Sequence, residues 1–408
     1  MKNKLFALII CICVLFTCCS CQNVEVTTAE RTTNGADLPI EPITAPETYV
    51  EEPSEVRISF LAVGDNIPHD SVINTAKNDA TGNEKYNFSE IYKGIASDVN
   101  AADIAFVNQE SPVGGEALGI SGYPNFNAPH EMIDELISVG FDVFNIANNH
   151  MLDKGEKGYR NTVDYFNSLP ITMIGGYTKS DYNNVRIVES KGVKIAFLSY
   201  TTLVNSGHAN DISSGSEYII PYANTADITR QVGIAKEQAD VVIVSMHWGN
   251  ENKFTIASEQ TKYAKLCADL GVDAVIGHHS HVPGKVEWVS GESGNKTLVA
   301  YSLGNFCSSQ LYAKNMIGEM LKFDIVKDVD GTISIENAYV DPVVCHYKTD
   351  TSRKDNQDLH VRYEVRMYML KDYTEEMSNS HGSQNWGRFS FANLKAYITD
   401  VVSSEFLK

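Results

Sequence analysis

Several apolar runs along the chain stop abruptly at residues that can bind metal ions. In the clearest run, from Asp273 to Ile276, the last two residues are β-branched and fit the interior of a sheet, and Gly277 then lets the backbone turn. His279 and His281 follow as alternate residues, which share one face of an extended segment. Because neutral imidazole is the commonest metal ligand in proteins, this stretch favours a metal site. Taken alone, it is also compatible with a polar turn that backbone hydrogen bonds satisfy.

The same pattern of an apolar run with a polar end occurs four more times. Strands are predicted over residues 56–63, 103–108, 141–147 and 239–246, and they lead into Asp65, Glu110, Asn149-His150 and His247. Predicted helices at 129–139 and 259–270 alternate with these strands, which indicates an α/β architecture. In such sheets, functional residues gather beyond the carboxyl ends of the strands. Five strand ends with metal-ligand chemistry are hard to explain as turns alone.

The remaining pattern predicts more of the sheet and a different C-terminal part. A hairpin is predicted over 185–189 and 193–200 around Gly192, and further strands over 285–289 and 297–301. From about Met320, the pattern changes to strand pairs around Asp330-Gly331 and then to predicted helices over 361–377 and 391–406. We interpret residues 326–408 as a strand and helix appendage of the same domain, without visible chemistry.

Composition and charge narrow the class of partner. The 408 residues are 43% hydrophobic, which is typical of a globular protein with a real core, and the formal net charge is −19. Nucleic acids and anionic lipid surfaces reward lysine and arginine, so this balance argues against both as partners. Cations are the natural counterpart of such a chain.

The first 21 residues are predicted to be a lipoprotein-type signal segment. Lys2 and Lys4 precede an apolar run, Leu5–Phe16, that is too short to span a bilayer as a mature helix. The cysteine-rich end resembles the lipobox of bacterial lipoproteins, in which either Cys18 or Cys21 would become the lipidated N-terminus. The alternative is an ordinary secretory signal with chance cysteines.

Residues 22–54 are predicted to be a disordered tether. They are rich in Thr, Glu and Pro and contain few large apolar groups, so they cannot bury enough surface to fold. Signal and tether together predict an outward-facing lipoprotein of a bacterial cell membrane, held by its lipid anchor. Beyond the signal segment, Cys267, Cys307 and Cys345 form an odd, widely spaced set that implies no disulfide framework.

Six motifs follow one another along the chain. They are Gly64-Asp65, Asn108-Gln109-Glu110, Ala147-Asn148-Asn149-His150 with Asp153 and Gly155, His247-Trp248-Gly249 with Glu251, Gly277-His278-His279-Ser280-His281-Val282 and Ser302-Leu303-Gly304-Asn305-Phe306. In this order they resemble the CapA family of capsule and poly-gamma-glutamate biosynthesis proteins, which is similar to the calcineurin-like metallophosphatases. The resemblance covers roughly residues 56–325 and implies a domain at 55–325 with a four-layer α/β/β/α metallophosphatase-like sandwich.

The resemblance implies a site for two divalent metal ions. Two neighbouring cations need a shared anionic oxygen to offset their repulsion. Mixed nitrogen and oxygen ligands suit Mn, Zn or Fe about equally. Carried over by position, Asp65 and His281 would bind one ion, Asn149, His247 and His279 would bind the other, and Glu110 would bridge them.

The resemblance also implies catalytic and substrate-contacting residues. His150 would act as general acid to the leaving group, and Asp153 would orient its imidazole. Trp248 and Glu251 would line the substrate cleft or pack the loop, and Asn305 would line the same cleft.

Two departures from the phosphatases set expectations for other residues. Ile67 stands where those enzymes place a histidine, and the bridging acid is a glutamate, so the first metal site would have a weaker ligand set. His69 either replaces the missing ligand or is a solvated turn residue, the latter being favoured. His278 is expected to orient the turn. The loop 205–217, which contains His208, is either a lid over the cleft or a surface connection. The remaining histidines, His346, His360 and His381, are expected on the surface.

Two functions fit these features. The first is a metal-dependent hydrolase or transferase of the cell envelope that acts in capsule polymer synthesis. The second is a non-enzymatic binding or export factor for an anionic polymer such as poly-gamma-glutamate or its precursor. Either would work with other membrane components of a capsule synthesis complex. His150 beside the metal cluster favours the enzyme, because a binding module needs no general acid.

The lipobox interpretation predicts that the double variant Cys18→Ser/Cys21→Ser leaves the membrane fraction, because neither cysteine can then carry a lipid. Fractionation of cells that produce the wild type and the variant measures this. A variant that stays in the membrane fraction, or that is processed normally, contradicts the interpretation.

Overall fold

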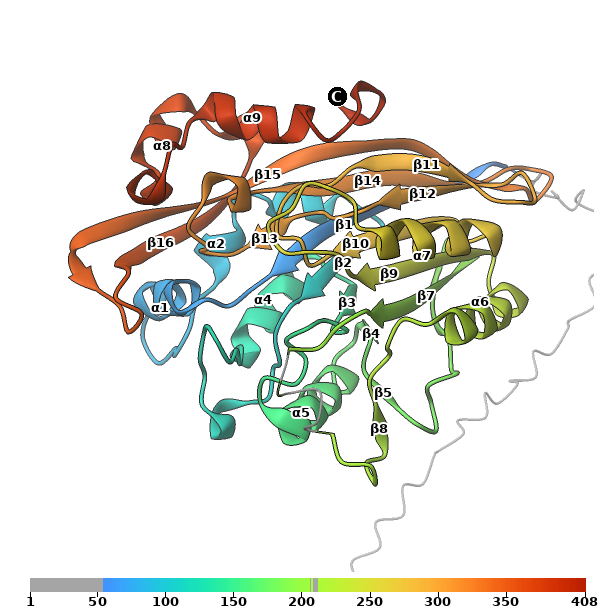
Figure 1. Cartoon of the computed structure of the whole chain (residues 1–408), viewed down its shortest axis with the longest axis horizontal. Coiled ribbons are helices and arrows are strands. Elements are labelled where there is room, and N and C mark those ends of the chain that lie inside the picture. The colour runs from blue at the N-terminus through green and yellow to red at the C-terminus, as the bar shows by residue number, and fades with distance from the viewer. Residues whose placement is uncertain (1–53, 206, 208–211) are drawn as a thin grey trace, which may run out of the picture. The chain divides into compact units, whose positions relative to one another are not determined.

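Two sheets packed face to face form the centre of the structure (Figure 1). The computed structural model describes residues 54–205, 207 and 212–408, so the predicted signal segment, the tether, Cys18, Cys21 and His208 lie outside the described residues. The described residues belong to one unit, Pro53–Lys408.

The first sheet combines parallel strands at one side with a long antiparallel extension at the other. Strands β1 to β4 pair in parallel, and β14, β15 and β16 add to β1 in antiparallel order. The sheet runs β16 (His360–Met369), β15 (Ile333–Lys354), β14 (Ile317–Lys327), β1 (Val56–Asn66), β2 (Ile104–Gln109), β3 (Val143–Asn145) and β4 (Thr172–Ile174), and β13 (Asn305–Cys307) pairs with the end of β1.

The second sheet is parallel in its centre and has an antiparallel strand at each edge. It runs β11 (Val286–Ser290), β12 (Lys296–Ala300), β10 (Ala274–His278), β9 (Val241–His247), β7 (Val193–Thr201) and β6 (Arg186–Ser190), while β5 (Tyr177–Thr178) and β8 (Tyr218–Ile219) form a separate ribbon.

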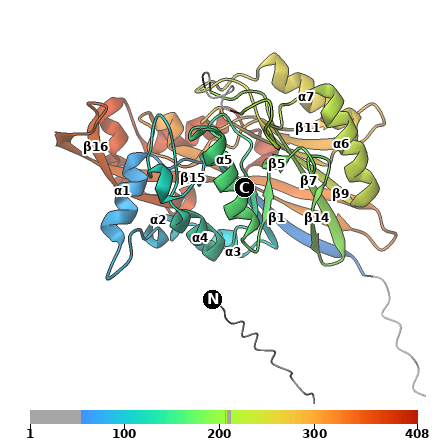
Figure 2. The ribbon, with the colours of Figure 1, turned by 90° about the horizontal axis from the view of Figure 1, so that it is seen from below.

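Helices cover the outer face of each sheet, which completes the predicted four layers (Figures 1 and 2). The helices α1 and α2 pack against β16 and α5 packs against β4, whereas α6 and α7 pack against the second sheet. The helices are α1 (Asp70–Asp79), α2 (Ser89–Tyr92), α3 (Ala96–Asn100), α4 (His130–Val139), α5 (Gly155–Asn167), α6 (Thr225–Gln238), α7 (Ser258–Asp269), α8 (Glu375–Ser380) and α9 (Phe391–Thr399), with short 3-10 turns η1 (Glu116–Leu118), η2 (Ala313–Asn315), η3 (Leu370–Asp372), η4 (Gly382–Trp386) and η5 (Ser404–Phe406).

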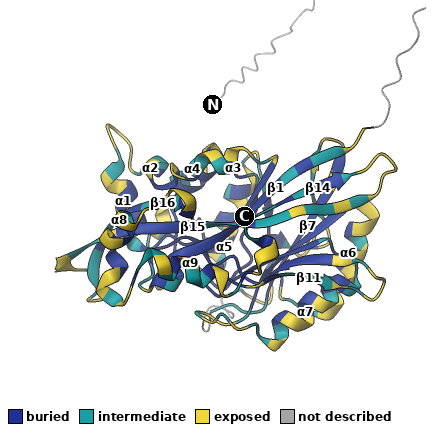
Figure 3. Cartoon of the chain, turned by 90° about the horizontal axis from the view of Figure 1, so that it is seen from above, coloured by how far each residue is buried: buried dark blue, intermediate teal, exposed yellow. Residues whose placement is uncertain are grey.

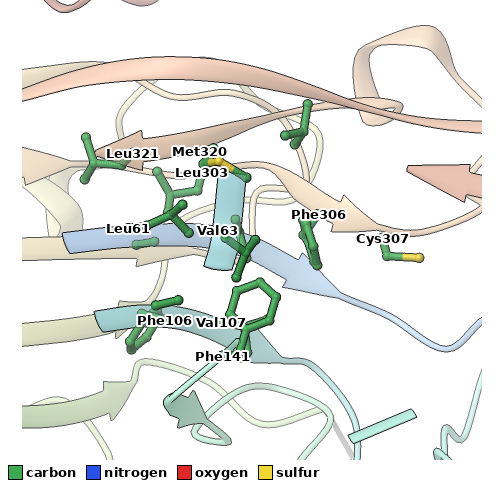
Figure 4. Packing of buried hydrophobic residues seen from close by; sticks show 14 of the residues in the cluster. Leu61, Val63, Phe106, Val107, Phe141, Leu303, Phe306, Cys307, Met320 and Leu321 are labelled. Atoms are coloured by element: carbon green, nitrogen blue, oxygen red, sulfur yellow. The ribbon is translucent and has the colours of Figure 1, made fainter. Parts of the chain in front are cut away.

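The apolar runs read from the sequence are strands buried on both faces. In β7, Phe197 packs toward the other sheet, where its ring centroid lies 6.2 Å from that of Phe60, while Tyr200 belongs to the cluster under α6 and α7. Because each sheet is covered on both sides, its central strands need no polar face. Figure 3 shows these strands as buried, and Figure 4 shows Val63 of β1 and Phe106 of β2 within the packed core.

The C-terminal part differs from the sequence expectation in one element. Residues 360–369 form strand β16, which pairs with β15, so the prediction of a helix over 361–377 is wrong. Val365, Met367 and Met369 are buried as alternate residues, a period of two that a helical interpretation does not explain. The predicted second helix exists as α9, but it ends at Thr399.

Two histidines expected on the surface are buried instead. His346 and His381 lie where the C-terminal helical turns cover β15, with their ring centroids 4.9 Å apart. His346 Nδ1 is 2.7 Å from the Tyr373 hydroxyl, and His381 Nε2 is 3.0 Å from the Cys345 carbonyl oxygen. The surface prediction failed because it treated this segment as an appendage without a core of its own. His360 is half-buried.

Two further features concern the helices and the cysteines. Across the described ranges, no helix has the length and apolarity needed to cross a bilayer. Cys267, Cys307 and Cys345 are buried free thiols.

The buried histidines predict that acid destabilises the fold. Burial lowers the pKa of His346 to about 4, whereas the pKa of a histidine in an unfolded chain is about 6.5. Below pH ~6.5 the unfolded chain therefore takes up a proton that the folded chain excludes, and this residue's contribution to stability falls by ~1.4 kcal/mol per pH unit as the pH drops toward its folded pKa.

The test is the free energy of unfolding in urea between pH ~7 and ~5 for the wild type, His346→Gln and the control His360→Gln. We expect a shallower loss of stability with falling pH in His346→Gln and the wild-type slope in the control. Equal slopes in all three proteins would contradict the role of His346.

Candidate metal centre

The polar strand ends of both sheets meet at one edge of the sandwich. Asp65 is the next-to-last residue of β1, Glu110 follows β2, and Asn149 follows the end of β3. His247 is the last residue of β9, and the neighbouring β10 places His278 opposite it. Because these strands are parallel, their carboxyl ends lie together, as the sequence pattern predicts.

Each sheet supplies a different kind of ligand atom. The first sheet contributes the oxygen atoms of Asp65, Glu110 and Asn149, and the second contributes the imidazoles of His247, His279 and His281. All six residues are buried, none more than 3% exposed. The centre therefore exists only where the two sheets pack against each other.

The turn after β10 has an unusual backbone. His279 and His281 have φ values of 91° and 57°, in the left-handed region that residues with a Cβ rarely adopt. The expectation that they share a face of an extended segment is therefore wrong, and a strained turn presents both rings instead. Gly277 is required before this turn, because a Cβ there would lie 2.2 Å from the Tyr301 carbonyl oxygen.

The ligand atoms form two trios that share Glu110. Glu110, His247 and His279 make one trio, and Asp65, Glu110 and His281 make the other, with ligand atoms within 4.8 Å of one another in each. Glu110 Oε1 lies 3.6 Å from His247 Nε2 and 3.8 Å from His281 Nε2. The structure thus groups these residues as the resemblance implied. Asn149 belongs with the first trio, since its Oδ1 is 2.9 Å from His247 Nε2.

The hydrogen bonding of the centre is incomplete without a further partner. Among the described residues, both carboxylate oxygens of Glu110 and the Nδ1 atoms of His247 and His279 are buried with no hydrogen bond. Buried polar atoms are nearly always paired, so each such atom needs an explanation. A bound cation would pair the carboxylate of Glu110, so the donor set fits a divalent metal.

The electrostatics of the centre support the same conclusion. Burial and the neighbouring Asp65 raise the pKa of Glu110 well above its usual range, so its charged form needs a cation nearby to be stable. Burial opposes the charge of Asp65, but the neighbouring imidazoles of His278 and His281 outweigh it and hold the pKa of Asp65 well below its usual range. Burial and His279 lower the pKa of His247, which keeps its imidazole in the neutral form that binds metals.

His150 and Asp153 are in direct contact beside the candidate ligands. His150 Nδ1 is 2.7 Å from Asp153 Oδ2, which also accepts a hydrogen bond from the Phe126 backbone N–H at 2.8 Å. The Phe126 ring contacts the imidazole edge-on, with centroids 4.7 Å apart. Asn205 Nδ2 lies 3.1 Å from the same Nδ1. These contacts fix the ring and leave Nε2 without a hydrogen-bond partner among the described residues.

The three residues assigned to the substrate cleft have different surroundings. Trp248 is fully buried and donates its indole N–H to the Tyr301 carbonyl oxygen, so it packs the loop, the second of the two alternatives. Asn305 is also buried, and its Oδ1 lies 3.1 Å from His281 Nδ1, which places it behind the ligand rather than in a cleft. Glu251 is exposed, and its carboxylate lies within 4.8 Å of ligand atoms of His279 and His281.

Two further histidines can now be placed. His69 is buried rather than solvated, and it belongs to neither ligand trio, so it does not replace the missing ligand. Burial, followed by the charge of Arg362, lowers its pKa to about 3. His278 is fully buried beside Asp65, with Nδ1 3.5 Å from Oδ1, where it supports the start of the turn.

Sequence reasoning missed a chain of amides that supports Asp65. Asn108 Nδ2 donates to Asp65 Oδ1 at 2.8 Å, and Asn145 Nδ2 donates to Asn108 Oδ1 at 2.8 Å. The Ser199 hydroxyl donates to Asn145 from the second sheet. The sequence does carry a signal for this chain of amides, because asparagines stand at the ends of successive predicted strands, where their side chains are expected to be buried.

Comparison with known sequences identifies the family. The family model described as "Bacterial capsule synthesis protein PGA_cap" matches residues 59–310. The PGA biosynthesis protein CapA of Bacillus subtilis is 30% identical over 207 residues, which cover 50% of this chain and 52% of that protein. The capsule biosynthesis protein CapA of Bacillus anthracis is 30% identical over 203 residues, with 49% and 48% covered. The chain spans about half the length of these curated relatives.

Solved structures show weaker similarity. The NAD nucleotidase of Haemophilus influenzae is 15% identical with a TM-score of 0.43, over 87% of this chain and 57% of that chain. The sulfate thiohydrolase SoxB of Thermus thermophilus is 12% identical with a TM-score of 0.34, over 72% and 42%. The assignment therefore depends on the sequence match, and the matched residues 59–310 include all six candidate ligands. The chain belongs to the family of bacterial capsule synthesis proteins named PGA_cap.

Proposed function

We propose that this protein acts in the synthesis of an anionic capsule polymer of the poly-gamma-glutamate type, as a metal-dependent hydrolase or transferase. The observation that carries the proposal is a buried carboxylate, Glu110, shared by two ligand trios beside the oriented pair His150 and Asp153. The names of the Bacillus relatives, which refer to PGA and capsule biosynthesis, support the polymer class.

The metal part of the proposal assigns two divalent ions to the centre. Asp65 and His281 hold one ion, Asn149, His247 and His279 hold the other, and Glu110 lies between them. When bound, such ions polarise a phosphoryl or acyl oxygen and supply a nucleophile at neutral pH. The buried oxygen and nitrogen atoms that lack partners support this assignment.

The catalytic part of the proposal assigns proton donation to His150. With Nδ1 held by Asp153, the ring presents Nε2 to the leaving group and delivers its proton there. Asp153 stabilises the protonated imidazole before the transfer and fixes its orientation throughout. Its second hydrogen bond, from the Phe126 backbone, anchors the carboxylate in that position.

The location assigned to the protein is the outer face of the cell membrane, where a lipid on Cys18 or Cys21 holds it beside other components of a capsule synthesis complex. The cysteine-rich end of the signal segment and the Thr- and Pro-rich stretch after it support this location.

The shared centre predicts coupled loss of metal. His247 and His279 come from different strands but would hold the same ion, so His247→Ala and His279→Ala should each lower bound metal by a similar amount. Metal analysis of the purified proteins by mass spectrometry measures this. The control His360→Ala should keep the wild-type content. Full occupancy in His279→Ala would refute the assignment.

The proposed acid predicts a separation of metal binding from turnover. His150→Ala should keep fold and metal but lose on the order of 10²–10⁴ in turnover, the usual contribution of a positioned acid. Asn149→Ala should lose metal as well, because its oxygen contacts the His247 site.

Turnover is measured on the substrate found in a screen of phosphodiesters and gamma-glutamyl compounds, with polymer production in cells as a second assay. If His150→Ala supports normal polymer production while Asn149→Ala abolishes it, the site acts by binding and the export-factor function takes precedence.

A further inference from the structure

A groove runs between α1 and the hairpin of β15 and β16, beside the metal centre. Two adjoining cavities of about 660 Å³ and 380 Å³ share Asn74, Arg353, Val361 and Arg362 in their walls. Figure 1 shows α1 beside β16, and the two elements are in contact. The hairpin lies beyond residue 310, where the match to the family ends. The groove is thus built partly from a segment outside the shared domain.

The walls of the groove carry four cations and three carboxylates. Lys77, Arg353 and Lys354 form no ion pair with another described residue within 4.0 Å, whereas Arg362 pairs with Asp355. The other two carboxylates accept local hydrogen bonds, Asp350 from Ser352 and Asp70 from the Gly122 backbone N–H. In a chain of net charge −19, a groove in which cations outnumber carboxylates offers a local site for a negatively charged ligand.

Arg362 adds a second, independent observation at the inner end of the groove. Its side chain is 7% exposed, and its guanidinium donates to the Ser309 carbonyl oxygen and to Asp355. Its Nε is buried and has no hydrogen-bond partner among the described residues. A guanidinium stays charged when buried and binds carboxylates through paired N–H groups, so the unused Nε suits a ligand oxygen in the groove.

A chain of buried contacts connects Arg362 with the metal centre. The Ser309 backbone N–H lies 3.4 Å from His69 Nδ1. The His69 ring contacts Phe126 edge-on at 5.3 Å between centroids, and Phe126 contacts His150 at 4.7 Å. The smaller cavity is also lined by residues 70 and 71, which directly follow His69. These contacts place the inner end of the groove on the side of the centre where His150 lies.

We propose that this groove binds a carboxylate-bearing polymer and guides it to the metal centre. Lys77, Arg353 and Lys354 would contact successive carboxylates along the chain, and Arg362 would bind the carboxylate nearest the centre. This inference rests on the proposed function for its choice of polymer. Because β15 and β16 carry three of these four cations, the C-terminal hairpin determines polymer binding, while the six ligands determine the chemistry.

The test measures binding of fluorescently labelled poly-gamma-glutamate of defined length to the full chain at several salt concentrations. The variant Lys77→Gln/Arg353→Gln changes two exposed residues of the groove and should raise the Kd by about tenfold, as expected for losing two charge contacts, with a weaker salt dependence. The control Lys262→Gln/Lys296→Gln removes the same charge from α7 and β12 and should stay within about twofold of the wild type. Bound metal is measured in every sample.

Each outcome decides between the claims. An equal loss of affinity in the groove variant and the control, or no binding of the polymer by the metal-loaded wild type, overturns the groove assignment and leaves the metal centre untouched. Competition by polyphosphate that is as strong as competition by unlabelled poly-gamma-glutamate overturns the choice of a carboxylate polymer. A wild type that binds the polymer but no metal contradicts the proposed function and leaves the groove in place.

Discussion

The structure depends on one buried carboxylate that no described residue pairs by a hydrogen bond. Glu110 is fully buried between two sets of ligands, and its two carboxylate oxygens accept no hydrogen bond from any described residue. Burying an unpaired carboxylate is costly, and the raised pKa of Glu110 expresses that cost. In the proposed function, a divalent cation beside Glu110 offsets this cost. The neighbouring side chains fit that role, because neutral imidazoles and one further carboxylate add little charge of their own.

The division of ligands between the sheets connects the fold with the site. Oxygen ligands come from the strand ends of the first sheet and imidazoles from those of the second, so the distance between the two kinds of ligand is set by how the sheets pack. The contact of Phe60 with Phe197 lies in the core that fixes this packing. Close to the centre, His281 with Asp65 and His247 with Asn149 connect the sheets through polar contacts. Mutations in the inter-sheet core are therefore expected to alter the site without touching a ligand.

Much of this arrangement could be predicted from the sequence, because parallel strands bring their polar ends to one edge whatever the loops do. The grouping of ligands around Glu110 was predictable in the same way, once the motif order was recognised. The rest depends on tertiary packing that local patterns do not report. The left-handed turn at His279 and His281 appears in the sequence only as a glycine before histidines. Trp248, His346 and His381 are polar or amphipathic residues that elements distant in sequence bury. The sequence pattern predicts a helix where β16 forms, although buried and less buried residues alternate along this strand.

The most direct test of the account is the metal content of Glu110→Gln beside that of Glu319→Gln. Both glutamates are fully buried without hydrogen-bond partners for their carboxylates among the described residues, but only Glu110 belongs to the ligand trios. The account predicts that the wild type and Glu319→Gln bind metal equally, and that Glu110→Gln loses metal from both sites while remaining folded. Equal metal content in all three proteins would contradict the claim that the shared carboxylate holds the centre together.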